Sequence, residues 1–161
     1  MTQELYQVDF HAWTLQQAAL LKAGRLSEVD LACLIEELES MGASERHQLR
    51  NRLKVLLAHL LKWQFQPDHQ SRSWRATIKE QRLSLQDLLD ENPSLRSTLD
   101  EQLYKAYRLA VQWAVRETNL DETVFPENCP FKLTEILALD WLPQGDCPHN
   151  EILNDPSNTA L

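Results

Sequence analysis

The sequence predicts an all-α protein: an antiparallel helical bundle of about five main helices, followed by a short C-terminal helix and an extended covering segment. Leucine occurs 29 times, valine and isoleucine together ten times, and glycine only three times. Strands favour β-branched residues and tight hairpins favour glycine, so this composition favours helices and excludes all-β, Rossmann-like and collagen-like folds. The length of 161 residues fits one domain, expected at residues 1–143, with a polar and mobile tail at 144–161.

Two helices are expected in the first quarter of the chain. Asp9 is suited to cap the first helix, and Gly24 stands where a left-handed residue commonly ends one. Ser27 and Asp30 resemble a capping box for the second helix, which Gly42 is expected to end. The apolar residues of this second helix recur at intervals of three and four: Leu31, Leu34, Ile35, Leu38 and Met41.

The third and fourth helices carry the clearest apolar patterns. Ser44 is suited to cap the third helix, which Pro67 is expected to halt. One broad face of the third helix is filled by leucines, namely Leu49, Leu53, Leu56, Leu57, Leu60 and Leu61. The fourth helix begins at Ser71 or Ser73. Its apolar side carries Trp74, Ile78, Leu85, Leu88 and Leu89.

A long fifth helix and a short last one complete the expected bundle. Asn92 and Pro93 separate the fourth helix from the fifth, since proline is tolerated in a first helical turn. The fifth helix extends to about Thr118, and Asn119 is suited to the left-handed residue that follows it. Beyond it, prolines favour extended or turned segments, and the last helix is expected over residues 133–139.

Charge is distributed unevenly along a chain whose formal net charge is −8. Residues 1–40 carry −5, residues 41–82 carry +6 and residues 83–161 carry −9. Four basic residues of the fourth helix lie within about 80° of one another at 100° per residue. They are expected to form a basic stripe on its outer face: Arg72, Arg75, Lys79 and Arg82.

Two interpretations of this basic stripe compete. It is either a solvated face that pairs with acidic residues of neighbouring helices, at roughly 0–1 kcal/mol a pair, or a contact for phosphate groups and nucleic acid. The acidic net charge and the absence of a nucleic-acid-binding motif favour the structural interpretation. Nucleic acid stays an alternative partner.

A polar set on the second and third helices offers the best case for chemistry: Glu36, Glu37, Glu39 and His59. If these helices pack antiparallel, Glu37 or Glu39 comes near His59 and forms a carboxylate–imidazole pair of the kind used in acid–base catalysis or metal binding. The Glu-x-x-His motif of di-metal bundles is absent, however, and a histidine at the margin of an apolar face is more often a packed residue. The set is therefore a candidate without an assigned catalytic role, and the sequence implies no metal and no cofactor.

The remaining signals concern the compartment. No P-loop, Gly-x-Gly-x-x-Gly or Gly-x-Ser-x-Gly motif is present. The cysteines, Cys33, Cys129 and Cys147, are odd in number and too widely spaced for a disulfide framework. Neither a signal peptide nor a transmembrane span is expected, so the expected location is the cytoplasm. Cys33 is expected to be buried as a small apolar residue.

A series of short segments resembles a known family when the segments are taken together. They are Asp9–Trp13 with Gln17-Ala18, Leu34–Glu39, His59–Trp63 with Gln66-Pro67, Ser73–Arg75, Thr77-Ile78 with Arg82, Pro93–Leu95, Glu117-Thr118, Phe125-Pro126 and Cys129–Phe131. In this order, over about residues 5–143, the chain resembles the bacterial domain-of-unknown-function family number twenty-nine. The resemblance implies a compact, all-helical bacterial cytoplasmic protein, and it implies no catalytic residue, cofactor or substrate.

The function that fits these patterns best is that of a non-enzymatic binding or assembly module that associates with itself. Leucine-rich helices of this length leave apolar area over after one bundle closes, and an isologous homodimer is the simplest way to cover it. Another protein partner would serve equally. Two alternatives stay open: a hydrolytic or metal-dependent enzyme that uses the Glu/His set, and a nucleic-acid-associated protein that uses the basic stripe.

Overall fold

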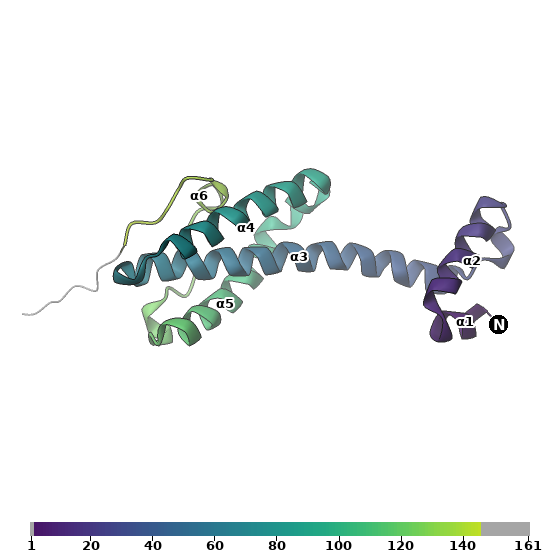
Figure 1. The fold of residues 1–161 in the computed structure, drawn as a ribbon, viewed down its shortest axis with the longest axis horizontal. Helices are drawn as coiled ribbons and strands as arrows, with labels where there is room; N and C mark the ends of the chain where they lie inside the picture. The colour runs from purple at the N-terminus through teal and green to yellow at the C-terminus, as the bar shows by residue number, and fades with distance from the viewer. Residues whose placement is uncertain (1, 146–161) are drawn as a thin grey trace, which may run out of the picture. The chain divides into compact units, whose positions relative to one another are not determined.

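The computed structural model describes residues 2–145, and in this range the chain is all-α, as the sequence predicts. Six α-helices are present among these residues (Figure 1): α1 (Thr2–Val8), α2 (Phe10–Lys22), α3 (Leu31–Phe65), α4 (Arg72–Glu91), α5 (Leu99–Thr118) and α6 (Leu133–Leu137). No strand occurs among the described residues. The expected polar tail at 144–161 lies, apart from its first two residues, outside the described range.

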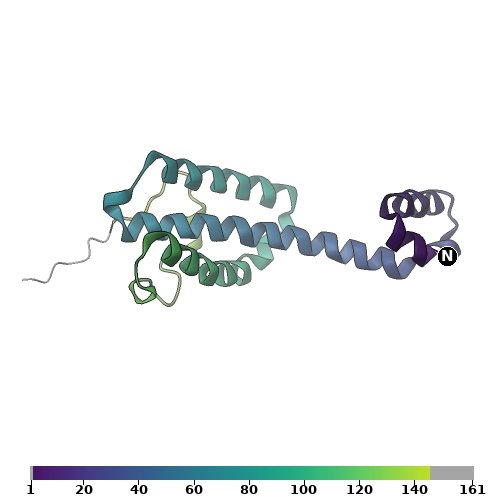
Figure 2. The ribbon, with the colours of Figure 1, turned by 60° about the horizontal axis from the view of Figure 1, so that its bottom comes forward.

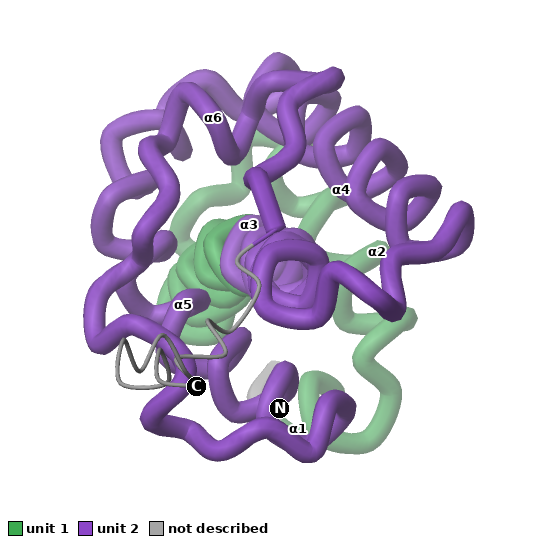
Figure 3. Tube along the Cα trace, turned by 90° about the vertical axis from the view of Figure 1, so that its left-hand side faces the viewer, with its two compact units in different colours: residues 1–47 green, residues 48–161 purple. Residues whose placement is uncertain are grey.

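The chain divides into two compact units, an N-terminal unit (Met1–His47) and a C-terminal unit (Gln48–Leu161), coloured separately in Figure 3. The boundary falls inside α3, so this helix contributes its first seventeen residues to one unit and the rest to the other. It also falls inside the range expected to form one domain, residues 1–143.

One continuous helix, α3, replaces the expected second and third helices. Gly42 and Ser44 do not end one helix and begin another, because both lie inside α3. A glycine in a helix interior costs only about 1 kcal/mol relative to alanine. Apart from the adjoining backbone of α3 and the two residues next to Gly42, no atom of the described residues lies within 4 Å of the place where a β-carbon of Gly42 would stand, so no packed neighbour forces a turn there. The expected antiparallel pairing of residues 31–42 with residues 44–66 is therefore wrong.

The C-terminal unit is a helical bundle built around the second half of α3. This part of α3 lies between α4 and α5 (Figures 1 and 2). Its leucines are fully buried, and they pack with a core that includes Ile78, Leu85 and Leu89 of α4 and Ala106, Ala110 and Ala114 of α5. Because the leucines of α3 span one arc of about 140° at 100° per residue, this broad face can pack against both neighbouring helices. The broad leucine face predicted from the sequence is confirmed.

Most helix ends follow the sequence signals. The Asp9 carboxylate accepts a hydrogen bond from the Ala12 amide at 2.9 Å, and the Ser71 hydroxyl accepts one from the Trp74 amide at 3.2 Å. Asn119 ends α5 with φ of 56°, in the left-handed region predicted for it.

The start of α3 and the segment before α5 differ from the prediction. Asp30, and not Ser27, caps α3, through a 3.2 Å hydrogen bond to the Cys33 amide. Ser27 lies in a short 3-10 turn, Leu26–Glu28. Residues Pro93–Thr98 likewise form 3-10 turns before α5 begins.

Candidate protein interaction surface

The N-terminal unit leaves most of its large apolar side chains exposed. Among the described residues, fourteen large apolar side chains are exposed, and nine of them belong to residues 8–41, with 43% to 85% of their surface accessible. These nine, which we call the exposed apolar set, are Val8, Phe10, Leu15, Leu21, Leu26, Leu31, Ile35, Leu38 and Met41. Concentration of exposed apolar residues in one small region is typical of an interaction site.

Within this set, one stripe follows α3. Leu31, Ile35 and Leu38 are separated by four and three residues, so they lie within about 60° of one another on the helix. All three are more than half exposed. The sequence assigned this stripe to the interior of a bundle, but Cys33, which is buried, and Glu37, which accepts from Tyr6 of α1, lie on another side of α3. The stripe is therefore a helix face that the N-terminal unit does not cover.

The interior of the N-terminal unit is small. Its buried residues are Trp13, Gln17, Val29 and Cys33. Trp13 packs edge-on against Tyr6, with ring centroids 4.8 Å apart. Gln17 accepts a hydrogen bond from the Asp30 amide at 2.8 Å, yet its own amide nitrogen and the indole nitrogen of Trp13 find no partner among the described residues. Fewer than fifty residues with so little buried apolar area form a marginal unit.

Acidic residues give this unit its electrostatic character. Residues 1–47 contain eight acidic and three basic residues, a formal charge of −5. Glu37 accepts a hydrogen bond from the Tyr6 hydroxyl, and this bond raises the pKa of Tyr6 to about 12. Glu36 and Glu39 are exposed and have no hydrogen-bond or ion-pair partner in the described part of the chain. Glu39 lies about 40° from Ile35, at the margin of the stripe, and Glu36 lies about 100° from Ile35 on the same side.

The structure does not bring the predicted Glu/His set together. Glu36, Glu37, Glu39 and His59 all belong to α3, because the turn that would have placed them on adjacent helices is absent. Twenty residues of continuous helix separate Glu39 from His59, about 30 Å at 1.5 Å per residue. The expected carboxylate–imidazole pair is therefore wrong, and within residues 2–145 no cluster of three or more metal-ligating side chains occurs.

His59 belongs instead to a polar network that sequence reasoning missed. The Lys62 ammonium is buried, 2.6 Å from Glu117 Oε2 of α5 and 4.5 Å from the ring centroid of Trp74 of α4. Trp113 donates its indole N–H to the other oxygen of Glu117. Lys62 and Glu117 lie 55 positions apart, so no local pattern links them.

The charges of this network are stabilised by their partners. Partial burial opposes ionisation of Glu117, but the hydrogen bonds from Lys62 and Trp113 outweigh it and lower the pKa of the carboxyl. Burial lowers the pKa of His59, whose Nδ1 lies 2.9 Å from the Val55 carbonyl oxygen, and the Lys62 charge adds to this effect. The network joins α3, α4 and α5 through satisfied contacts, as a structural ion pair does.

The predicted basic stripe of α4 holds for three of its four members. Arg72, Arg75 and Lys79 are exposed, and none has an ion-pair or hydrogen-bond partner among the described residues. The prediction that Arg82 lies on the outer face is wrong, because this residue is fully buried. It follows Ile78 by four residues and precedes Leu85 by three, the spacing of a core position, and this signal could have identified it.

Arg82 holds the C-terminal covering segment against α4. Its guanidinium donates to the carbonyl oxygens of Glu135 (3.1 Å), Ile136 (2.8 Å), Leu139 (3.3 Å) and Trp141 (2.7 Å). Burial lowers its pKa, while the nearby Asp140 carboxylate acts in the opposite direction. Arg82 is therefore a structural residue whose donors are occupied.

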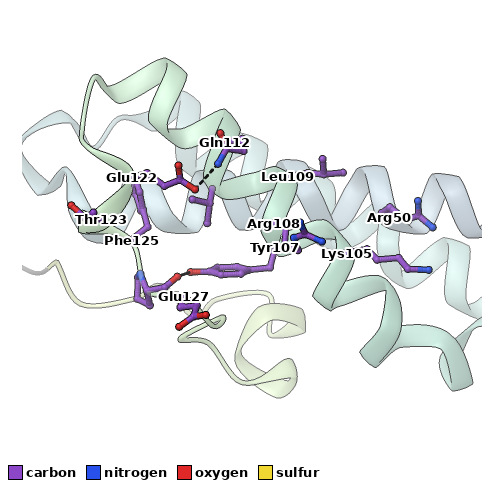
Figure 4. Close-up of a pocket in the computed structure, with 12 residues that line it drawn as sticks. Arg50, Lys105, Tyr107, Arg108, Leu109, Gln112, Glu122, Thr123, Phe125 and Glu127 are labelled. Atoms are coloured by element: carbon purple, nitrogen blue, oxygen red, sulfur yellow. Dashed lines mark hydrogen bonds between the residues drawn. The ribbon is translucent and has the colours of Figure 1, made fainter.

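A cleft of about 740 Å³ in the C-terminal unit is lined mainly by α5 and the segment after it, with Arg50 of α3 (Figure 4). Tyr107 donates its hydroxyl proton to the Pro126 carbonyl at 2.6 Å, and Gln112 donates to Glu122 at 2.7 Å. Arg50 donates to Gln102 at 2.9 Å. The lining residues that the structure describes include no histidine, cysteine or serine, and the Thr123 hydroxyl donates to Asp121 at 2.6 Å, so the cleft offers polar contacts but no nucleophile paired with a histidine.

The described thiols offer no nucleophile either. Cys33 and Cys129 are free cysteines, and burial is the main reason that the pKa of each is raised. A raised pKa keeps a thiol protonated and unreactive. The predicted burial of Cys33 is confirmed. None of the helices within residues 2–145 combines the length and the apolar character needed to cross a bilayer.

Comparison with known proteins agrees with the resemblance noted in the sequence. A family model described as "Domain of unknown function DUF29" matches residues 5–142. Nothing matches the chain among curated proteins or among solved structures.

Proposed function

The chain belongs to the DUF29 family, a domain of unknown function, and we propose that it is a helical protein-interaction module that associates with itself through its N-terminal unit. The observation that carries the proposal is the exposed apolar set of residues 8–41. Association would remove this surface from water, at about 25 cal/mol per Å² of apolar area.

The small interior of the N-terminal unit supports the same proposal. A unit that buries four residues and leaves two buried donors without partners gains most from covering its surface with another chain. The C-terminal unit has a complete leucine core of its own and serves as the stable base for the module. Binding, and not catalysis, is the activity that these features favour.

The cytoplasm is the compartment that we assign to the module. The free thiols of Cys33 and Cys129 support this assignment, because cysteines stay reduced in the cytoplasm.

The test is the mass of the purified protein in solution. Light scattering at micromolar concentration is expected to give a mass above the 18.7 kDa of one chain. Replacing Ile35 and Leu38 by glutamate is expected to reduce the mass to that of a monomer, because both side chains are exposed and their loss leaves the interior intact. Circular dichroism would confirm that the variant keeps its helices.

Leu109→Glu is the matched control. Leu109 is also about half exposed but lies on α5 in the C-terminal unit, so this variant is expected to keep the oligomeric mass. A wild-type protein that stays monomeric at 100 μM would contradict self-association, and an I35E/L38E variant with unchanged mass would show that the surface lies elsewhere.

A further inference from the structure

The charged residues at the two ends of α4 have the opposite signs to those that stabilise a helix. Negative side chains stabilise the N-terminus of a helix and positive ones the C-terminus, each by about 0.3–1 kcal/mol at low ionic strength. In α4 the first turn holds no acidic residue and the last turn holds no basic one. Arg72 and Arg75 stand at its start and Asp90 and Glu91 at its end. This arrangement does not serve the stability of α4.

The spacing of the basic residues of α4 destabilises this helix further. Arg75 and Lys79 are four residues apart, so their like charges are neighbours on the helix surface, about 5–6 Å apart at the β-carbons. Neither forms an ion pair or a hydrogen bond among the described residues, although both line a cleft together with Asp140. Ala76 and Leu83 are exposed beside them. We call this the basic face of α4: Arg72, Arg75, Ala76, Lys79 and Leu83.

The stripe of α3 in the N-terminal unit has the complementary chemistry. Leu31, Ile35 and Leu38 form an exposed apolar line, and two carboxylates without a hydrogen-bond or ion-pair partner among the described residues lie on one side of it: Glu39, about 40° from Ile35, and Glu36, about 60° further round the helix. These two carboxylates are three residues apart, which gives nearly the same spacing as the charges of Arg75 and Lys79. We call this the acidic face of α3.

We propose that the acidic face of α3 in one copy binds the basic face of α4 in a second copy, so that the self-association proposed above joins two different surfaces. The inference rests on that proposed function. Two acidic faces of α3 would repel each other if they met, whereas the basic face neutralises Glu36 and Glu39 and covers the apolar line with Ala76 and Leu83. Contacts between unlike surfaces close into a ring or continue as a chain of copies.

The test uses charge reversal on each face separately. R75E/K79E and E36K/E39K are each expected to weaken association at least about tenfold and to give a monomeric mass at a concentration where the wild type is oligomeric. All four side chains are exposed, so circular dichroism is expected to show the helix content of the wild type. R108E/R116E is the control for net charge. It changes two exposed basic residues of α5, and its mass is expected to stay that of the wild type.

Mixing the two variants decides whether the faces meet each other. In an equimolar mixture the reversed α4 of one variant faces the reversed α3 of the other, and association is expected to return to within about threefold of the wild-type affinity. If R75E/K79E and E36K/E39K are each monomeric and stay monomeric when mixed, the inference is overturned. An oligomeric wild type whose mass neither variant changes would also overturn it, although self-association itself would then stand.

A monomeric wild type would remove the proposed function together with this inference. A nucleic-acid role gives a different result. If R75E/K79E kept the oligomeric mass but lost a low-salt electrophoretic shift of a duplex DNA probe, the basic face would belong to nucleic acid and the inference would be overturned.

Discussion

His59 and Glu117 link the stability of the C-terminal unit to pH in the same direction. Burial lowers the pKa of His59 below its ordinary value of 6.5, so the unfolded chain binds a proton more readily than the folded one. The contribution of His59 to the stability of the folded state is therefore fully present above about pH 6.5, and it is lost as the pH falls toward the lowered pKa. Glu117, whose pKa is lowered by Lys62 and Trp113 against the effect of burial, adds a further loss below its ordinary value of 4.5.

His59→Gln isolates the histidine effect. Between pH 7.5 and 5.5 the free energy of unfolding of the wild type is expected to fall by less than about 1.4 kcal/mol per pH unit, the limit for one proton. The variant is expected to show a smaller fall, because its side chain does not titrate. Urea unfolding at the two pH values measures both. The exposed His47 and His69 are present in both proteins, and equal falls would contradict the assignment.

Single residues with a charge were the hardest to place from the sequence. Arg82 and Lys62 are both buried. Arg82 donates to four backbone carbonyl oxygens, and Lys62 contacts a carboxylate and an indole ring. Glu117 lies 55 positions from Lys62 and the carbonyl oxygens lie more than fifty positions from Arg82, whereas Trp74 lies twelve positions from Lys62. A charged side chain is buried only where such partners compensate its desolvation, and although local spacing marks position 82 as a core position, it does not identify those partners.

At the scale of elements, the two glycines expected to end helices, Gly24 and Gly42, differ in backbone conformation and position. Gly24 ends α2 with φ of +70°, a conformation that other residues rarely adopt. Gly42 lies inside α3, where a β-carbon would meet no atom of the described residues within 4 Å apart from the adjoining helix backbone and the two neighbouring residues. Sequence reasoning treated both as helix ends, and only the structure separates them.

Gly42→Ala is therefore expected to stabilise the protein by about 0.5–1 kcal/mol, because alanine favours the helix and restricts the unfolded chain. Gly24→Ala is expected to destabilise it by about 1–2 kcal/mol, since alanine is strained at positive φ. Urea unfolding of the two variants measures both effects. If Gly42→Ala destabilised the protein, a continuous α3 at this position would be contradicted.

At the scale of the whole molecule, the two units differ in how much they depend on association. The core of the C-terminal unit is complete within one chain, whereas the N-terminal unit exposes its apolar set. Local stability follows buried apolar contact, so the N-terminal unit is expected to open more readily.

Hydrogen exchange at two protein concentrations tests this difference. Amides of residues 31–41 are expected to exchange faster than those of residues 53–61 in dilute protein, and to gain protection as the concentration rises. Protection of residues 53–61 is expected to stay constant. Exchange in residues 31–41 that is slow and independent of concentration would show that the N-terminal unit is stable without a second copy.

The sequence by itself determined the helical class, the family and most helix ends. Apolar spacing, caps such as Asp9 and Ser71, and the left-handed Asn119 act within a few residues, so they can be identified one segment at a time. The tertiary structure alone decided that α3 is continuous, which carbonyl oxygens accept from the buried Arg82, and that Leu31, Ile35 and Leu38 stay exposed. The physical reason is that periodicity identifies the apolar side of a helix, while the partner that covers this side comes from distant segments or from another chain.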